Sequence, residues 1–231
     1  LFASNTQVRA FSFSAEDGVF GVVRGRLRRE TDLDSSLRGI LGQDRSFEEV
    51  VGEVGAFKAI GGPGFANHVL AFRLSGGMGF GPGADAFHFE LGGAEGVAEG
   101  VTGLGLFGGT PLLFPVRGYP RDFRFGRLAW SASAEYRFPI ALVDRGLGSF
   151  PLHFDRIHGS VFFDAGNAWG PELGVTGFEN PRMGDLASVG AEMSVMLQPF
   201  YAGTVRMRFG FGYPLRVLSD PRFYVRIGSP F

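Results

Sequence analysis

The sequence has 231 residues and no cysteine, which excludes a disulfide framework and thiolate metal sites. Its net charge is −1, so charge gives no reason to expect nucleic acid or a strongly acidic molecule as a partner. It contains 26 phenylalanines and 38 glycines, a composition typical of strands joined by turns and bulges. No uninterrupted apolar run of about eighteen residues occurs, which argues against a transmembrane helix. The chain starts at Leu1 without a basic or apolar leader, so we expect it to be the C-terminal part of a longer, processed protein.

Period-two alternation recurs along the chain, and helical periodicity is nearly absent. The pattern predicts ten strands of roughly nine to eleven residues, the length that spans a bilayer in a barrel. In chain order they cover residues 7–15, 18–29, 48–60, 66–79, 85–92, 127–139, 157–168, 186–198, 203–214 and 222–231. The weakest is 48–60, where Val51 and Phe57 interrupt the alternation. Residues 31–46 and 93–126 are expected to form the long loops.

The alternation alone does not say which face is inside. In a soluble sandwich the apolar face packs inward and the polar face meets water. In a membrane barrel the apolar face meets lipid and polar residues line the lumen. Aromatic residues near strand ends, such as Tyr136 and Phe211, resemble an interfacial girdle. Arginine and glutamate in mid-strand, where a lumen can pair them, also favour the barrel.

Motifs for catalysis or cofactor binding are weak. Residues 103–108 spell G-x-G-x-x-G, but they lie in a predicted loop rather than between a strand and a helix. No nucleophile elbow occurs. The four histidines, His68, His88, His153 and His158, lack metal-ligand spacing. We therefore expect no catalytic residue, no metal and no cofactor.

Two stretches are more specific. The first is FPVRGYP at 114–120, where one arginine, Arg117, precedes Gly118 and two prolines restrict the flanking backbone. The second is the C-terminus, where Phe223, Val225 and Ile227 share a face and Phe231 ends the chain. A strand that ends at the last residue is expected to take part in barrel closure, because an exposed edge strand invites unwanted pairing.

These stretches resemble a known family. The terminal strand looks like the C-terminal signal of bacterial outer-membrane barrels. Residues 159–169 (GSVFFDAGNAW) resemble the thirteenth strand of the BamA-type assembly and translocation superfamily, also called the bacterial surface antigen family. FPVRGYP is similar to the signature on its sixth extracellular loop, and 203–215 to its penultimate strand. Five predicted strands follow Arg117, as in the sixteen-stranded family barrel.

The resemblance implies an all-β fold, an antiparallel transmembrane β-barrel. Residues 1–231 would be the C-terminal part of the barrel domain, with 93–126 as a long, lumen-directed extracellular loop. Arg117, Gly118 and Tyr119 would anchor that loop, and Arg117 would contact Phe162 and Asp164 on the barrel wall. Strand parity supports this independently, because Phe162 and Asp164 share the predicted lumen face. The barrel signal and seam would comprise Phe223, Val225, Ile227, Gly228 and Phe231, with Pro230 weakening the seam because it cannot donate a ladder hydrogen bond.

The implied function is assembly and insertion of barrel proteins in the bacterial outer membrane, without enzymatic activity. The implied partners are outer-membrane lipid, unfolded outer-membrane or secreted polypeptides and periplasmic accessory proteins. Three alternatives stay open: a two-partner-type secretion transporter of the same superfamily, a passive diffusion channel, and a soluble β-sandwich enzyme or lectin. The sequence does not identify the substrate.

Overall fold

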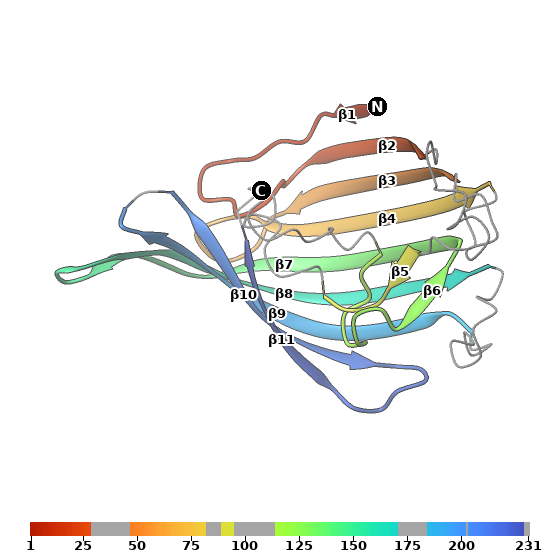
Figure 1. Ribbon diagram of the computed structural model, residues 1–231. Helices are drawn as coiled ribbons and strands as arrows, with labels where there is room; N and C mark the ends of the chain where they lie inside the picture. Colours follow the sequence, from red (N-terminus) through yellow and green to blue (C-terminus); the bar gives the residue numbers. More distant parts are fainter. Residues whose placement is uncertain (29–46, 82–88, 95–113, 171–183, 202, 229–231) are drawn as a thin grey trace, which may run out of the picture.

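A single curved antiparallel sheet of nine strands dominates the computed structural model (Figure 1). The structure describes residues 1–28, 47–81, 89–94, 114–170, 184–201 and 203–228. The strands of the large sheet, in spatial order, are β1 (Phe2–Ser4), β2 (Gly18–Arg28), β3 (Phe47–Ile60), β4 (His68–Phe80), β7 (Leu128–Leu147), β8 (Phe150–Trp169), β9 (Leu186–Pro199), β10 (Val205–Pro214) and β11 (Arg222–Gly228). Two short strands, β5 (Phe89–Leu91) and β6 (Arg124–Gly126), form a second sheet.

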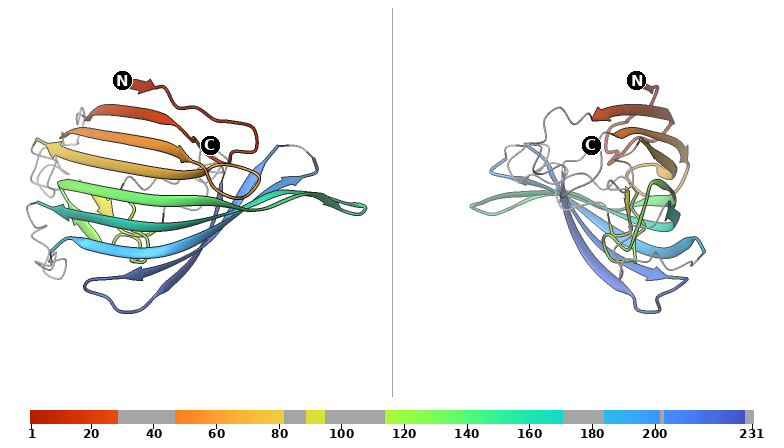
Figure 2. Two further views of the ribbon diagram at one scale, coloured as in Figure 1. Left: turned by 180° about the vertical axis from the view of Figure 1, so that it is seen from behind. Right: turned by 45° about the vertical axis from the view of Figure 1, so that its right-hand side comes forward.

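Each strand of the large sheet pairs with its neighbour in the chain, except that β4 pairs with β7. The described parts of the segment between β4 and β7, which include β5 and β6, lie against the concave face of the sheet (Figures 1 and 2). Among the described strands, β1 and β11 are the two edges of an open sheet. The all-β, antiparallel prediction is confirmed, and the described chain forms part of a barrel wall.

The distribution of side chains is the reverse of that in a soluble sandwich. Large apolar side chains on the convex face are exposed: Val19, Val23, Val54, Phe72, Leu74, Val161, Phe163, Val189, Met193, Phe209, Val225 and Ile227. Polar and charged side chains are buried on the concave face: Glu49, Ser75, Ser131, Asp164, Ser188, Glu192, Arg206 and Arg226. In water such an apolar surface would be costly, so the convex face is the lipid face and the concave face is the lumen. This excludes the soluble β-sandwich.

The described ranges contain no helix that is long and apolar enough to cross a membrane.

Two of the ten predicted strands do not form wall strands in the described residues. Residues 7–15 form only an isolated bridge between Gln7 and Asp17 and otherwise turn into the concave side. There Phe13 stacks on His158 of β8 with ring centroids 3.8 Å apart. For 85–92, only Phe89–Leu91 is a described strand, and it pairs with β6 rather than joining the barrel wall.

Two other predicted strands are too short. β7 and β8 continue past the predicted ends at 139 and 157 and form a hairpin that projects beyond the neighbouring strands (Figure 2). Register shifts occur in this extension, beginning between Pro139 and Ala141. The two residues that interrupt the alternation of β3 both face the lumen. Val51 packs against the buried cluster under the loop, and the Phe57 ring lies 5.7 Å from the guanidinium of Arg137.

Candidate functional site

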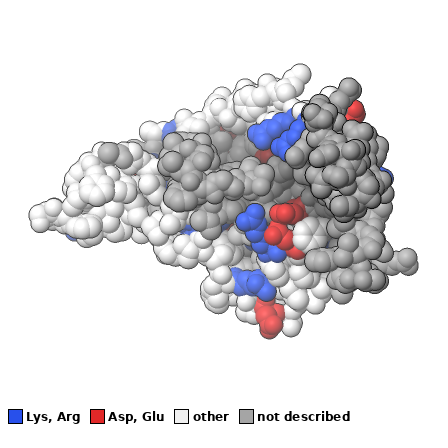
Figure 3. Space-filling model, in the orientation of Figure 1, with Lys and Arg blue, Asp and Glu red and all other residues white. Residues whose placement is uncertain are grey.

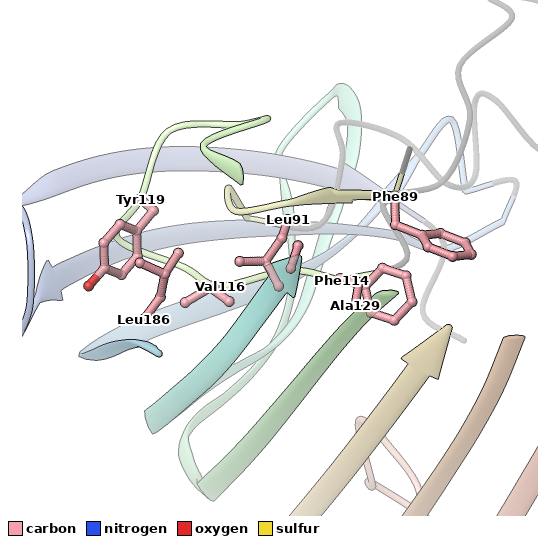
Figure 4. Packing of buried hydrophobic residues seen from close by; sticks show 8 residues of the cluster. Phe89, Leu91, Phe114, Val116, Tyr119, Ala129 and Leu186 are labelled. Carbon is pink, nitrogen blue, oxygen red and sulfur yellow. The ribbon is translucent and has the colours of Figure 1, made fainter. Parts of the chain in front are cut away.

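The loop that carries Arg117 is packed against the lumen wall by a buried apolar cluster (Figure 4). Phe114, Val116 and Tyr119 come from the loop, Phe89 and Leu91 come from β5, and Ala129, Ala168 and Leu186 come from β7, β8 and β9. Leu91, Phe114, Val116 and Leu186 are fully buried. Each such side chain stabilises the packed state by about 1.5–3 kcal/mol, so the loop is held firmly before any polar contact is counted.

The guanidinium of Arg117 is bound to Asp164 of β8. The side chain donates from Nε to Oδ2 and from Nη2 to Oδ1, both at 2.7 Å, and the backbone N–H of Arg117 donates to Oδ2 at 3.0 Å. Arg117 and Asp164 are 4% and 1% exposed. This is the two-pronged arginine–carboxylate geometry, which combines strength with a fixed orientation. Phe162 lies beneath it, with Cζ of Arg117 3.6 Å from the ring centroid.

The neighbouring strands add three further partners to Arg117. Ser133 of β7 accepts a hydrogen bond from Nη2 at 2.8 Å and donates one to Asp164 at 2.7 Å. Nη1 of Arg117 lies 2.6 Å from a Glu135 carboxylate oxygen and 3.5 Å from one of Glu192. Burial alone would lower the pKa of Arg117, but the Asp164, Glu135 and Glu192 carboxylates hold it well above its ordinary value.

The register of the sheet explains why these residues meet. Asp164 is paired directly with Ser133 of β7 and with Ser188 of β9. Phe162 is paired with Glu135 on one side and with Gly190 on the other. A side chain at Gly190 would overlap the Phe162 ring, since its Cβ would lie 2.4 Å from that ring. Gly190 therefore leaves the ring room to lie along the wall beneath Arg117.

Gly118 lets the loop backbone reach the wall of β10. Its φ is +92°, a conformation that residues with a Cβ rarely adopt. A Cβ at Gly118 would lie 3.1 Å from the backbone carbon of Gly212, and one at Gly212 would lie 2.6 Å from the Gly118 nitrogen. The two glycines thus bring the loop and β10 into direct backbone contact.

Tyr119 extends the contact to the ends of β9 and β10. Its hydroxyl lies 2.9 Å from the carbonyl oxygen of Ala187 and 2.7 Å from that of Arg216, either of which can accept its proton. Its ring is buried and lies beside Leu186 (Figure 4). Arg117, Gly118 and Tyr119 therefore contact β7, β8, β9 and β10 together.

The structure brings together the residues that the family resemblance assigned to the loop and to the wall: Arg117, Gly118, Tyr119, Phe162 and Asp164. Sequence reasoning missed Ser133, Glu135, Glu192 and the two wall glycines Gly190 and Gly212. Glu135 and Glu192 do lie on predicted polar faces, so strand parity could have found them once the strand pairing was known.

The terminal strand, β11, lies at one edge of the sheet. Phe223, Val225 and Ile227 of β11 face outward and are 80%, 50% and 40% exposed. Gly228 pairs with Arg206 of β10. Pro230 and Phe231 lie outside the described residues, as does the G-x-G-x-x-G stretch at 103–108. The seam stays a prediction, because it would join the terminal strand to the first strand of the complete barrel, and among the described strands β11 pairs only with β10.

The described ranges hold no group of three or more metal-ligating side chains. His68 contacts the Tyr136 hydroxyl at 2.6 Å and the Pro63 carbonyl oxygen at 2.9 Å. His153 pairs with Asp144 on the projecting hairpin at 3.2 Å. His68 and His153 thus have protein partners in two separate places, and His88 lies outside the described residues.

Comparison with known protein families identifies the family of this chain. The model of the Omp85 superfamily domain matches residues 11–231. The chain belongs to the Omp85 superfamily. No curated protein sequence matches it. Omp85 proteins are non-enzymatic and act in the insertion or secretion of proteins at the outer membrane of Gram-negative bacteria. The inside-out sheet and the loop packed in its lumen agree with that membership.

Proposed function

We propose that this chain is the C-terminal part of an outer-membrane barrel domain that assembles and inserts other barrel proteins, as a BamA-like Omp85 protein. The observation that carries the proposal is the attachment of the 114–124 loop to four strands of the lumen wall through Arg117, Gly118 and Tyr119. A polypeptide or a solute passing through the lumen would have to displace this loop. Displacing the loop would break the buried ion pair between Arg117 and Asp164, which costs about 3–5 kcal/mol. Transport through the lumen would therefore require an energetically unfavourable opening step.

Assembly at the barrel edge leaves the loop in place. β11 has seven residues and pairs only with β10 among the described strands. An unfolded client strand can add to such an edge by main-chain hydrogen bonding, with its apolar side chains facing lipid. The outward residues Phe223, Val225 and Ile227 continue the lipid face to this edge. Gly228, Pro230 and Phe231, at the end of the chain, would form the weak seam, since proline cannot donate a ladder hydrogen bond.

The proposed partners follow from this mechanism. They are unfolded outer-membrane proteins, the surrounding lipid and periplasmic accessory proteins. Arg117 has a structural role here, in which it holds the loop and takes no part in covalent chemistry. The protein is proposed to work in the outer membrane and without a cofactor.

Depletion of the protein in its own bacterium tests the proposal. We expect the folded fraction of several other barrel proteins, measured by their heat-modifiable mobility on gels, to fall. Expression of the Arg117→Ala variant in the depleted cells should restore that fraction poorly. An Arg145→Gln copy, altered at an exposed site on the projecting hairpin, should restore it fully. Loss of one secreted polypeptide with normal barrel assembly would instead identify a two-partner transporter. A bilayer conductance unchanged by Arg117→Ala, with both processes normal, would identify a passive channel.

A further inference from the structure

A cavity of about 300 Å³ lies in the lumen between two inward-folded segments. The anchored loop contributes Pro115 and Arg117 to its lining, and the segment before β2 contributes Ser14 and Ala15. The remaining lining comes from the strands of the wall. The cavity is at the lower end of the size range of small-molecule sites, so it suits a small ligand rather than a polypeptide.

The cavity lining is rich in arginine. Six arginines line it: Arg73, Arg117, Arg137, Arg206, Arg208 and Arg226. Three acidic residues line it: Glu53, Glu135 and Asp164. Figure 3 shows patches of basic and acidic side chains near the middle of the concave face. The described lining therefore carries more positive than negative charge.

Asp164, Glu135 and Glu192 are each paired with particular arginines. Asp164 and Glu135 hold Arg117, and Glu135 also pairs with Arg137 at 2.6 Å. Glu192 accepts from Arg226 and from the Tyr224 hydroxyl. Within the part of the chain that the structure describes, the side chain of Arg208, on β10, makes no hydrogen bond or ion pair. Its guanidinium is available to a ligand in the cavity.

The strand register places like charges side by side at this point. Arg208 is the direct cross-strand partner of Arg226, and both side chains face the lumen. Arg206 lies two residues away on the same face of β10 and donates to the Phe13 carbonyl. Like charges directly opposite each other destabilise a sheet. An anion between the guanidinium groups would convert this repulsion into attraction.

We propose that Arg208, together with Arg206 and Arg226, forms a binding site for a small oxyanion of the phosphate class. Guanidinium groups bind phosphate through paired N–H donors, and one tetrahedral oxyanion has enough oxygens to accept from more than one arginine. The site opens to the lumen, on the opposite side of the wall from the exposed apolar side chains, so its ligand comes from water rather than from lipid. A bound anion would contact β10 and β11, and Arg206 of β10 also contacts Phe13 in the segment before β2.

Thermal unfolding of the full-length protein in detergent tests this site, with inorganic phosphate as the probe and chloride to match ionic strength. We expect phosphate to raise the midpoint temperature saturably in the wild type. Arg208→Gln should weaken the apparent phosphate affinity about tenfold or more, because charge-assisted hydrogen bonds are lost. Arg145→Gln, on the projecting hairpin, is the matched control and should leave the affinity unchanged.

Stability without phosphate separates binding from a structural role. Arg208→Gln should then unfold at the same temperature as the wild type or higher, since it removes a like-charge pair. If this variant does not fold, Arg208→Lys keeps the charge and should bind phosphate more weakly while remaining folded. The proposal is overturned if the wild type shows no saturable response, if Arg208→Gln responds like the wild type, or if both Arg208 variants only lose stability.

Discussion

Replacing Arg117 by alanine removes the guanidinium that joins the loop to the lumen wall. Two charge-assisted hydrogen bonds to Asp164 are lost, along with the contacts to Ser133 and Glu135 and the stacking on Phe162. Asp164, which is 1% exposed, is left as a buried carboxylate without its cation. Breaking a buried pair from one side costs about 3–5 kcal/mol, so we expect the free energy of unfolding to fall by that amount.

A double-mutant cycle measures the pair directly. Arg117→Ala, Asp164→Ala and the double variant are unfolded in urea in lipid vesicles, with the fluorescence of the two tryptophans as the signal. Because each single change leaves the other charge buried, the double variant should be more stable than the sum of the single losses predicts, with a coupling energy of about 1–3 kcal/mol. Losses that add within about 0.5 kcal/mol would show that the two residues do not interact energetically, and would refute the reasoning.

Three further substitutions and one deletion test other parts of the structure. Gly118→Ala should lower the free energy of unfolding by about 1–3 kcal/mol, because the φ of Gly118 is +92° and the β10 backbone is close. Gly61→Ala, where nothing lies within 4 Å of the added Cβ, is the control and should be neutral in the same unfolding assay. Tyr119→Phe keeps the ring but removes the buried hydroxyl, so the loop should exchange its amide hydrogens faster, at a cost of about 1–3 kcal/mol; unchanged exchange would speak against that contact. Phe163→Arg places a charge on the lipid face and should lower stability by about 2–4 kcal/mol if the site is near mid-membrane, while Phe163→Leu should be tolerated; equal effects in vesicle-embedded protein would contradict the assignment of the convex face to lipid. Deleting Phe231, at the end of the terminal strand pattern, should reduce membrane insertion, measured as protease-resistant protein in the outer membrane; normal insertion would remove the basis for a terminal signal.

Side-chain alternation predicted most of the barrel wall because each strand has one lipid face and one lumen face. Parity alone placed Phe162 and Asp164 on the lumen face, where the structure shows them in contact with Arg117. Glu135 and Glu192 were on predicted polar faces too. Their meeting at Arg117 depends on the registers of β7 with β8 and β8 with β9, which alternation within one strand does not encode.

The wall strands predicted at 7–15 and 85–92 were misplaced because their alternating residues pack inside the lumen instead of forming the wall. Phe89 and Leu91 alternate with Glu90, but both apolar side chains are buried in the cluster under the loop, and the strand is only three residues long. Phe13 lies in another alternating stretch, yet it turns inward and stacks on His158. Local pattern cannot distinguish these short segments from wall strands, because tertiary packing decides which surface covers them.

The burial of the loop in the lumen is the central claim, and cysteine labelling of the protein in intact outer membranes tests it most directly. The natural sequence has no cysteine, so a single Val116→Cys reports on a side chain that is fully buried, and Arg121→Cys on the same loop is an exposed control. We predict that a water-soluble maleimide labels position 121 quickly and position 116 only slowly, and that Arg117→Ala exposes position 116. Rapid labelling of Val116→Cys with Arg117 intact would contradict a loop held against the lumen wall.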